Sequence, residues 1–239
     1  SEGIEGVAAA AVDGKLEIYG IPRATGDDSS TTAVASTIII GEDDMGPPAV
    51  LEQINRTGVE VAIVPEQHSI MGVKSKVKCV AEIVNKNIEA GRLFEEKLDP
   101  AINKLEIASQ KVLEKKTKAI FILGLQSGSP LIGGMNTSAN GLIEMIGAKN
   151  VLSSFEGWKP VSTESILMAE PDVILISNRG LSAFGDVESL RQHPALALTP
   201  AAKNNNIIAM DGMAMLGFGP RTIFSALNIA NDILDINDK

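Results

Sequence analysis

Tyr19 and Arg23 are the residues whose possible chemistry is easiest to name. Tyr19 is the only tyrosine in the chain, and Arg23 follows it by four residues. A phenolate oxygen is a hard anionic ligand that suits ferric iron, but a free tyrosine loses its proton only near pH ~10. A guanidinium beside the phenol would favour the anion. We therefore treat Tyr19 as a candidate iron ligand supported by Arg23; the alternative is a buried core tyrosine.

Trp158 is the only tryptophan of the chain, and Lys159 follows it directly. Its flat indole can serve as a stacking surface with Lys159 as an anion partner, or it can be a half-buried anchor of the surface. Met135, Met213 and Met215 have soft side chains that fill irregular gaps in a core. The same softness would suit contact with an apolar macrocycle.

The chain contains none of the familiar catalytic signatures. His68 and His193 lie near prolines and outside any nucleophile–base arrangement, and no nucleophile elbow, His-Glu-x-x-His pair or phosphate loop occurs. The acidic run 42–44 could supply general acid–base groups, although a solvated loop explains it more simply. Cys79 is the only cysteine and falls in an apolar pattern, which excludes an intrachain disulfide and disfavours a zinc site. We expect a protein that is not an enzyme.

Composition limits the partners and the compartment. The net charge of −9 argues against nucleic acid, because neutralising phosphates requires clustered Lys and Arg. No apolar run approaches the ~20 residues of a membrane span. Ser1 begins without a charged and then apolar leader, so we expect an export signal to be absent from this form. The chain also lacks an N-terminal cysteine, which argues against a lipid anchor.

Strands and helices are predicted to alternate along the chain. The pattern favours strands at 37–41, 59–64, 119–123, 172–176 and 207–210, and helices at 49–56, 69–85, 137–146 and 221–236. Residues 124–134 read as a glycine-rich loop, and residues 1–35 carry little signal. Such alternation predicts parallel sheets, with functional loops at the carboxyl ends of the strands.

A long amphipathic helix is predicted between two such blocks. Apolar residues recur at three- and four-residue steps through 87–116, with Glu and Lys on the other face, and Pro100 is the one residue that opposes a regular helix. We therefore predict an α/β fold of two Rossmann-like lobes with parallel sheets, bridged by one long helix. The expected boundaries are 1–86, 87–116 and 117–239, with a ligand held between the lobes.

Five segments of the sequence resemble one known family. They are Gly46–Ile54, Asn136–Ala139, Trp158–Ser162, Pro194–Ala202 and Asp211–Thr222. These segments are similar to parts of the periplasmic haem-binding proteins that serve haem ABC importers, which are class III substrate-binding proteins. The resemblance runs from about residue 36 to the C-terminus. It implies two α/β lobes, one bridging helix and haem held between the lobes.

The resemblance also implies roles for particular residues. The family's axial iron ligand is a tyrosine of the N-terminal lobe with a basic partner, which points to Tyr19 and Arg23. Residues 1–35 depart from the family's order, since Tyr19 precedes Gly20 and Arg23 follows after four residues rather than two. Some relatives add a histidine from the loop at 125–127, but this chain has Leu-Gln-Ser there, so no second ligand is carried over.

The function implied is that of a periplasmic protein that captures ferric haem b and delivers it to an inner-membrane ABC permease. Lys159, Arg179 or Arg221 would meet the haem propionates, while Met135, Trp158 and Met213 would contact the porphyrin. Glu2 and Glu188 are candidates for docking onto the permease. We expect a monomer that touches the membrane only through that complex.

Two other functions stay open at the level of sequence. The same fold could bind a ferric siderophore or a corrinoid, although one Trp, one Tyr and six Phe give a siderophore site few aromatic side chains. An enzyme or metal-cluster scaffold on the same plan is disfavoured by the lack of clustered Cys and His.

Overall fold

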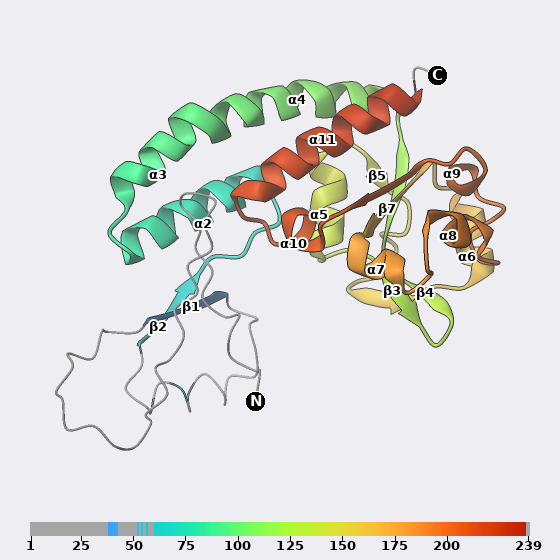
Figure 1. The fold of residues 1–239 in the computed structure, drawn as a ribbon, viewed down its shortest axis with the longest axis horizontal. Coiled ribbons are helices and arrows are strands. Elements are labelled where there is room, and N and C mark those ends of the chain that lie inside the picture. The colour runs from blue at the N-terminus through green and yellow to red at the C-terminus, as the bar shows by residue number, and fades with distance from the viewer. Residues whose placement is uncertain (1–37, 43–51, 53, 55, 57–59, 238–239) are drawn as a thin grey trace. The chain divides into compact units, whose positions relative to one another are not determined.

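The computed structural model describes residues 38–42, 52, 54, 56 and 60–237 (Figure 1). The described residues divide into two compact units. The first contains those up to Glu66 together with Lys74–Phe94, and the second contains Gln67–Val73 and the chain from Glu95 onward. The chain passes between the units at residues 66–67, 73–74 and 94–95, the last two within helical segments.

The described part of the first unit has two parallel strands. β1 (Ile38–Glu42) pairs with β2 (Glu60–Val64), with Ile38 opposite Glu60. Both predicted strands are therefore confirmed to within a residue. The buried Lys76 of α2 (Ile70–Ile83) donates a hydrogen bond to Glu42 in β1, which ties this helix to the sheet.

The predicted long helix is helical from Asn87 to Glu114, but it is not uniform. It consists of α3 (Asn87–Leu93), a π-helical turn η1 (Phe94–Leu98) and α4 (Asp99–Glu114). Pro100 lies in the first turn of α4, where its missing N–H is tolerated. In a regular α-helix the Pro100 ring would clash with the backbone carbonyl of the residue four positions earlier. That residue lies within the wider π-helical turn η1. The prediction that Pro100 opposes a regular helix through this segment is thus confirmed.

The sheet of the second unit is mixed rather than parallel throughout. Its main strands are β3 (Lys118–Gln126), β4 (Ser129–Gly133), β6 (Trp158–Pro160), β7 (Val173–Ser177) and β8 (Ile207–Met210), in the order β6-β4-β3-β7-β8. β3, β7 and β8 are parallel, and the short β5 (Lys149–Asn150) pairs with the start of β3. β4 is antiparallel to both of its neighbours.

The prediction of a loop at 124–134 is wrong, because this segment forms the hairpin of β3 and β4. Ser127 and Gly128 connect the strands with φ values of 50° and 81°. Two successive positive φ values are those of the type I′ turn, which matches the twist of antiparallel strands. Glycines and a proline concealed the strands, since such residues usually mark loops.

Seven helices of the second unit follow the hairpin. They are α5 (Ser138–Met145), α6 (Thr163–Ala169), α7 (Asn178–Ser182), α8 (Val187–Gln192), α9 (Pro200–Lys203), α10 (Gly212–Leu216) and α11 (Pro220–Asn237). The N-cap side chains of α5 to α10 each accept a backbone N–H, which satisfies part of the helix start. α11 lies beside α4 in Figure 1. None of the described helices is long and apolar enough to cross a membrane.

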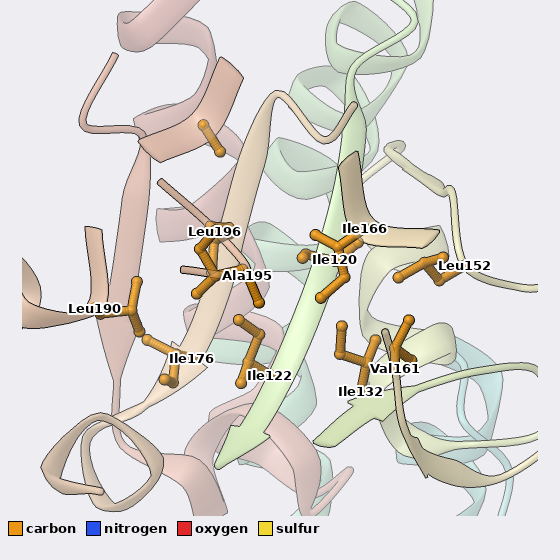
Figure 2. Packing of buried hydrophobic residues seen from close by; sticks show 12 residues of the cluster. Ile120, Ile122, Ile132, Leu152, Val161, Ile166, Ile176, Leu190, Ala195 and Leu196 are labelled. Carbon is orange, nitrogen blue, oxygen red and sulfur yellow. The ribbon is translucent and has the colours of Figure 1, made fainter. Parts of the chain in front are cut away.

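Alternate residues of the strands form the core on one face of this sheet. Ile120, Ile122, Ile174 and Ile176 pack with Leu190 and Leu196 from the chain that covers the face (Figure 2). Neighbouring residues Ala119, Phe121, Val173 and Leu175 are equally buried and belong to the opposite face, because side chains alternate along a strand. Burial on both faces fixes the central strands, since each enclosed Ile contributes about 1.5–3 kcal/mol.

Gly147 is expected to tolerate no side chain. Its φ is 78°, and a Cβ would lie 2.0 Å from the Ser109 carbonyl oxygen of α4. Gly128 has a similar φ of 81° with nothing within 4 Å of a Cβ. We expect Gly128→Ala to cost about 1 kcal/mol from backbone strain alone, and Gly147→Ala about 3 kcal/mol or more because it also forces atoms apart. Urea unfolding followed by circular dichroism measures both, and equal losses would contradict the steric argument.

Asp232 is expected to reduce stability at neutral pH. Partial burial in α11, and then the charge of Asp235, raise its pKa above the usual value. The folded state therefore holds this proton more tightly than the unfolded chain, and the stability gained below pH ~4 is lost as pH rises through the raised pKa. We expect Asp232→Asn to raise the melting temperature by ~1 °C at pH 7, a small effect because most of the carboxyl faces water. The gain should vanish near pH ~3; a pH-independent gain would contradict this cause.

Candidate functional site

The carboxyl ends of β7 and β8 carry two short capped helices side by side. Ser177 ends β7 and pairs with Met210 at the end of β8. The buried Ser177 Oγ accepts the Gly180 N–H at 2.9 Å, which starts α7. Asp211 Oδ1 accepts the Ala214 N–H at 2.8 Å, which starts α10. Each strand thus leads directly into a fixed turn at this edge of the sheet.

The first turn of α7 also packs against β3. A Cβ on Gly180 would lie 2.4 Å from the Leu123 carbonyl oxygen, so only glycine allows this approach. The pairing of β3 with β4 shifts register between Ile122 and Gly124, which leaves Leu123 in a bulge and 36% exposed. Leu123 is a residue of this edge that sequence reasoning missed. The glycine after the apolar run was the available signal, because such glycines often mark bulges.

The connection from β4 to α5 lies toward the same edge. β5 follows α5 and pairs parallel with the start of β3, Lys149 lying opposite Lys118. α5 therefore runs antiparallel to β3, and its first turn lies toward the carboxyl end of that strand. Thr137 caps this turn, its Oγ1 accepting the Asn140 N–H at 3.1 Å and donating to the Gly134 carbonyl at 2.7 Å.

Four of the predicted site residues belong to these elements. Met135 is 42% exposed in the β4–α5 connection, and Met213 is 70% exposed in α10. Arg179 is exposed in α7, and Arg221 is exposed in the first turn of α11, which follows α10. These neighbouring elements of the second unit therefore present two thioethers and two guanidinium groups to solvent. Such a combination suits a ligand with an apolar body and anionic substituents.

Trp158 and Lys159 lie on opposite faces of β6 and have different partners. They are consecutive in β6, so their side chains leave opposite faces of the strand. The Trp158 ring meets Phe121 edge-on, with centroids 6.0 Å apart. The Lys159 Nζ lies over the Phe155 ring at 5.6 Å from its centroid. Trp158 is half-buried, which agrees with the simpler interpretation of a surface anchor.

Few groups in the described part of the chain suit iron. Tyr19 and Arg23 lie outside the described residues. Residues 38–42 and 60–237, with the few described between them, contain no group of three His, Cys, Asp or Glu side chains able to hold a metal. His193 Nδ1 accepts the Ala195 N–H at 3.3 Å, which engages one nitrogen of this ring. His68 packs against Phe218 with centroids 4.8 Å apart.

The acidic groups with lowered pKa values belong to helix starts rather than to this edge. The Ser189 backbone N–H lowers the pKa of Asp186 at the start of α8. A hydrogen bond from the Glu164 backbone N–H lowers the pKa of the Glu164 carboxyl most, and a hydrogen bond with the Ser162 side chain lowers it further. Glu188 accepts from Arg191 at 2.6 Å and from Gln192 at 2.7 Å, so both of its oxygens are in use. Glu2 lies outside the described residues.

A family model described as periplasmic binding protein matches residues 36–214, three-quarters of the chain. The chain belongs to the periplasmic binding protein family. The expected substrate-binding fold is confirmed, because the chain matches solved structures of periplasmic binding proteins over most of its length.

Three solved relatives are periplasmic haem-binding proteins. RhuT from Roseiflexus sp. RS-1, in its apo form, is 28% identical with a TM-score of 0.75, over 83% of this chain and 76% of that one. HutB of Vibrio cholerae is 32% identical with a TM-score of 0.70, over 82% and 76%. BhuT, in complex with two haems, is 26% identical with a TM-score of 0.73, over 83% and 75%. These are solute-binding proteins of transport systems rather than enzymes.

A curated relative is similar over much of the chain at lower identity. It is an uncharacterized ABC transporter substrate-binding lipoprotein, YvrC of Bacillus subtilis strain 168, 20% identical over 197 residues. The match covers 82% of this chain but only 61% of that relative. Family membership indicates an extracytoplasmic substrate-binding protein.

Proposed function

We propose that this protein captures ferric haem b in the periplasm and delivers it to an inner-membrane ABC permease. The observation that carries the proposal is the similarity, at 26–32% identity over more than four-fifths of the chain, to three haem-binding proteins. The exposed edge with Met135, Met213, Arg179 and Arg221 supports it, since haem is a flat apolar macrocycle with two carboxylates. The protein would act as a monomer whose contact with the membrane is limited to the permease.

Tyr19 is the proposed axial ligand of the iron, with Arg23 favouring the phenolate. The support is chemical and by elimination. The described residues contain no cluster of metal ligands, and a backbone hydrogen bond already engages one nitrogen of His193. A single axial ligand would suit a carrier, because release to the permease then requires breaking only one bond to iron.

The positions of the haem contacts follow from the edge described above. Met135 and Met213 would lie against the porphyrin, and Arg179 and Arg221 would meet the propionates. Lys159 is a further cation for a propionate, and Trp158 would contact the ligand by its exposed side. Glu2 and Glu188 remain proposed contacts with the permease, Glu188 with its carboxylate already oriented by Arg191 and Gln192.

A hemin titration followed by absorbance tests the ligand and its axial residue together. We expect wild type to give a saturable change in the Soret band and Tyr19→Phe to lose at least ~100-fold in affinity, since the phenolate bond to iron is removed. His193→Ala is the matched control and should bind as wild type. Unchanged binding by Tyr19→Phe would exclude Tyr19 as ligand. No binding by wild type would exclude haem and favour a ferric siderophore or a corrinoid.

The two arginines can be tested by removing the charges of the ligand. We expect Arg179→Gln and Arg221→Gln each to weaken hemin binding about 3- to 10-fold, the effect of one partly exposed ion pair. Hemin dimethyl ester lacks the carboxylates, so both variants should bind it as wild type does. Arg92→Gln, which removes an exposed charge from α3, is the control. Equal losses for hemin and its ester would show that these arginines do not meet the propionates.

A further inference from the structure

Asn150 is a buried amide that joins three elements of the second unit. It is 4% exposed in β5. Its Nδ2 donates to the Gly133 carbonyl at the end of β4, 3.1 Å away, and to Asn140 Oδ1 in α5, 3.0 Å away. Its Oδ1 accepts the Leu152 N–H at 3.1 Å. Both amide hydrogens and the amide oxygen are therefore used.

Asn140 also fixes the orientation of the Asn150 amide. Asn140 donates through Nδ2 to Glu144 Oε1 at 2.8 Å, which turns its own oxygen toward Asn150. Removing one partner would leave a buried polar group unpaired, which costs more than the bond itself contributes. The Asn150 side chain thus has one favourable orientation, and in that orientation it donates a hydrogen bond to the Gly133 carbonyl.

The residues after Gly133 are held by backbone bonds to the chain before β6. Met135 donates its N–H to the Phe155 carbonyl at 2.7 Å and accepts the Gly157 N–H at 2.9 Å. Gly134 donates to the Gly157 carbonyl at 2.9 Å, and a Cβ on Gly134 would lie 2.2 Å from the Phe155 carbonyl oxygen. The backbone around Met135 is therefore fully engaged while its side chain is 42% exposed.

We propose that Asn150 is a positioning residue for ligand binding, because its hydrogen bond to Gly133 holds Met135 in the orientation that meets the ligand. This inference rests on the proposed function, in which Met135 contacts the porphyrin. Asn150 itself does not touch the ligand. A side chain that is already fixed loses little freedom on binding, so the contact retains more of its free energy.

Asn150→Asp removes the two hydrogen bonds that the Asn150 amide donates, to Gly133 and to Asn140. The aspartate keeps an acceptor for the Leu152 N–H but places an oxygen against the Gly133 carbonyl and Asn140 Oδ1. We expect hydrogen exchange at the Met135 and Gly157 amides to rise at least ~10-fold without ligand, and the Kd for hemin to rise about 10-fold. Met135→Ala should cost about 5-fold in wild type but less than 2-fold in the Asn150→Asp background.

Asn206→Asp is the matched control. Asn206 Nδ2 donates to the Asp172 carbonyl at 3.1 Å, so the same substitution removes the same kind of bond between the starts of β7 and β8, on the other side of β3 from β4. This variant should lose stability without changing exchange at Met135 or the affinity for hemin. If Asn150→Asp does not fold, Thr137→Val releases the same connection, since the Thr137 hydroxyl donates to the Gly134 carbonyl.

The outcomes separate this inference from the proposed function. Additive effects of Asn150→Asp and Met135→Ala on hemin affinity would overturn the positioning role. An unchanged rate of hydrogen exchange at the Met135 amide in Asn150→Asp would also overturn the positioning role, and this measurement is made without ligand. Absence of hemin binding by wild type would instead refute the proposed function, and the exchange measurement would still decide whether Asn150 holds Met135.

Discussion

Burial of β3 on both faces is the constraint on which the second unit depends. Ile120 and Ile122 face one layer and Ala119 and Phe121 the other, and all four are fully enclosed. A strand buried in this way needs hydrogen-bonding partners on both edges, because unpaired backbone groups in an apolar interior are costly. β4 lies on one side and β7 on the other. The parallel pairing with β7, and through it with β8, brings the starts of α7 and α10 to one edge.

The same constraint explains what could be predicted from the sequence. Long apolar strands and periodic helices report burial directly, so β7, β8, α5 and α11 were expected at nearly the right residues. β3 was expected only over 119–123, although it continues to Gln126. β6 and β5 are only three and two residues long and gain their structure from neighbouring strands. The β4 strand contains Pro130 and follows Gly128, so local composition pointed to a loop. Pairing across the hairpin decided its structure instead.

The sequence indicated residue types for the site but not how those residues are arranged. Exposed Met135 and Met213, with Arg179 and Arg221, belong to elements at one end of the sheet, as the rule for strand carboxyl ends implies. Trp158 and Lys159 are consecutive in a strand, so their side chains face opposite ways, which residue type alone did not indicate. Asn150 gave no signal at all, since a buried amide is recognised only from its partners, which are up to 17 residues away in sequence.

The π-helical turn at Phe94–Leu98 bears on how chains of this family differ in length. A π turn contains one residue more than an α-helical turn, so it amounts to a local insertion that leaves the helical phase on either side almost unchanged. α3 and α4 can therefore keep their buried faces with or without the extra residue. In an alignment of homologous chains, we would place a one-residue gap within this turn and shift neither flank. Variation in length would then leave the packing of α4 against α11 intact.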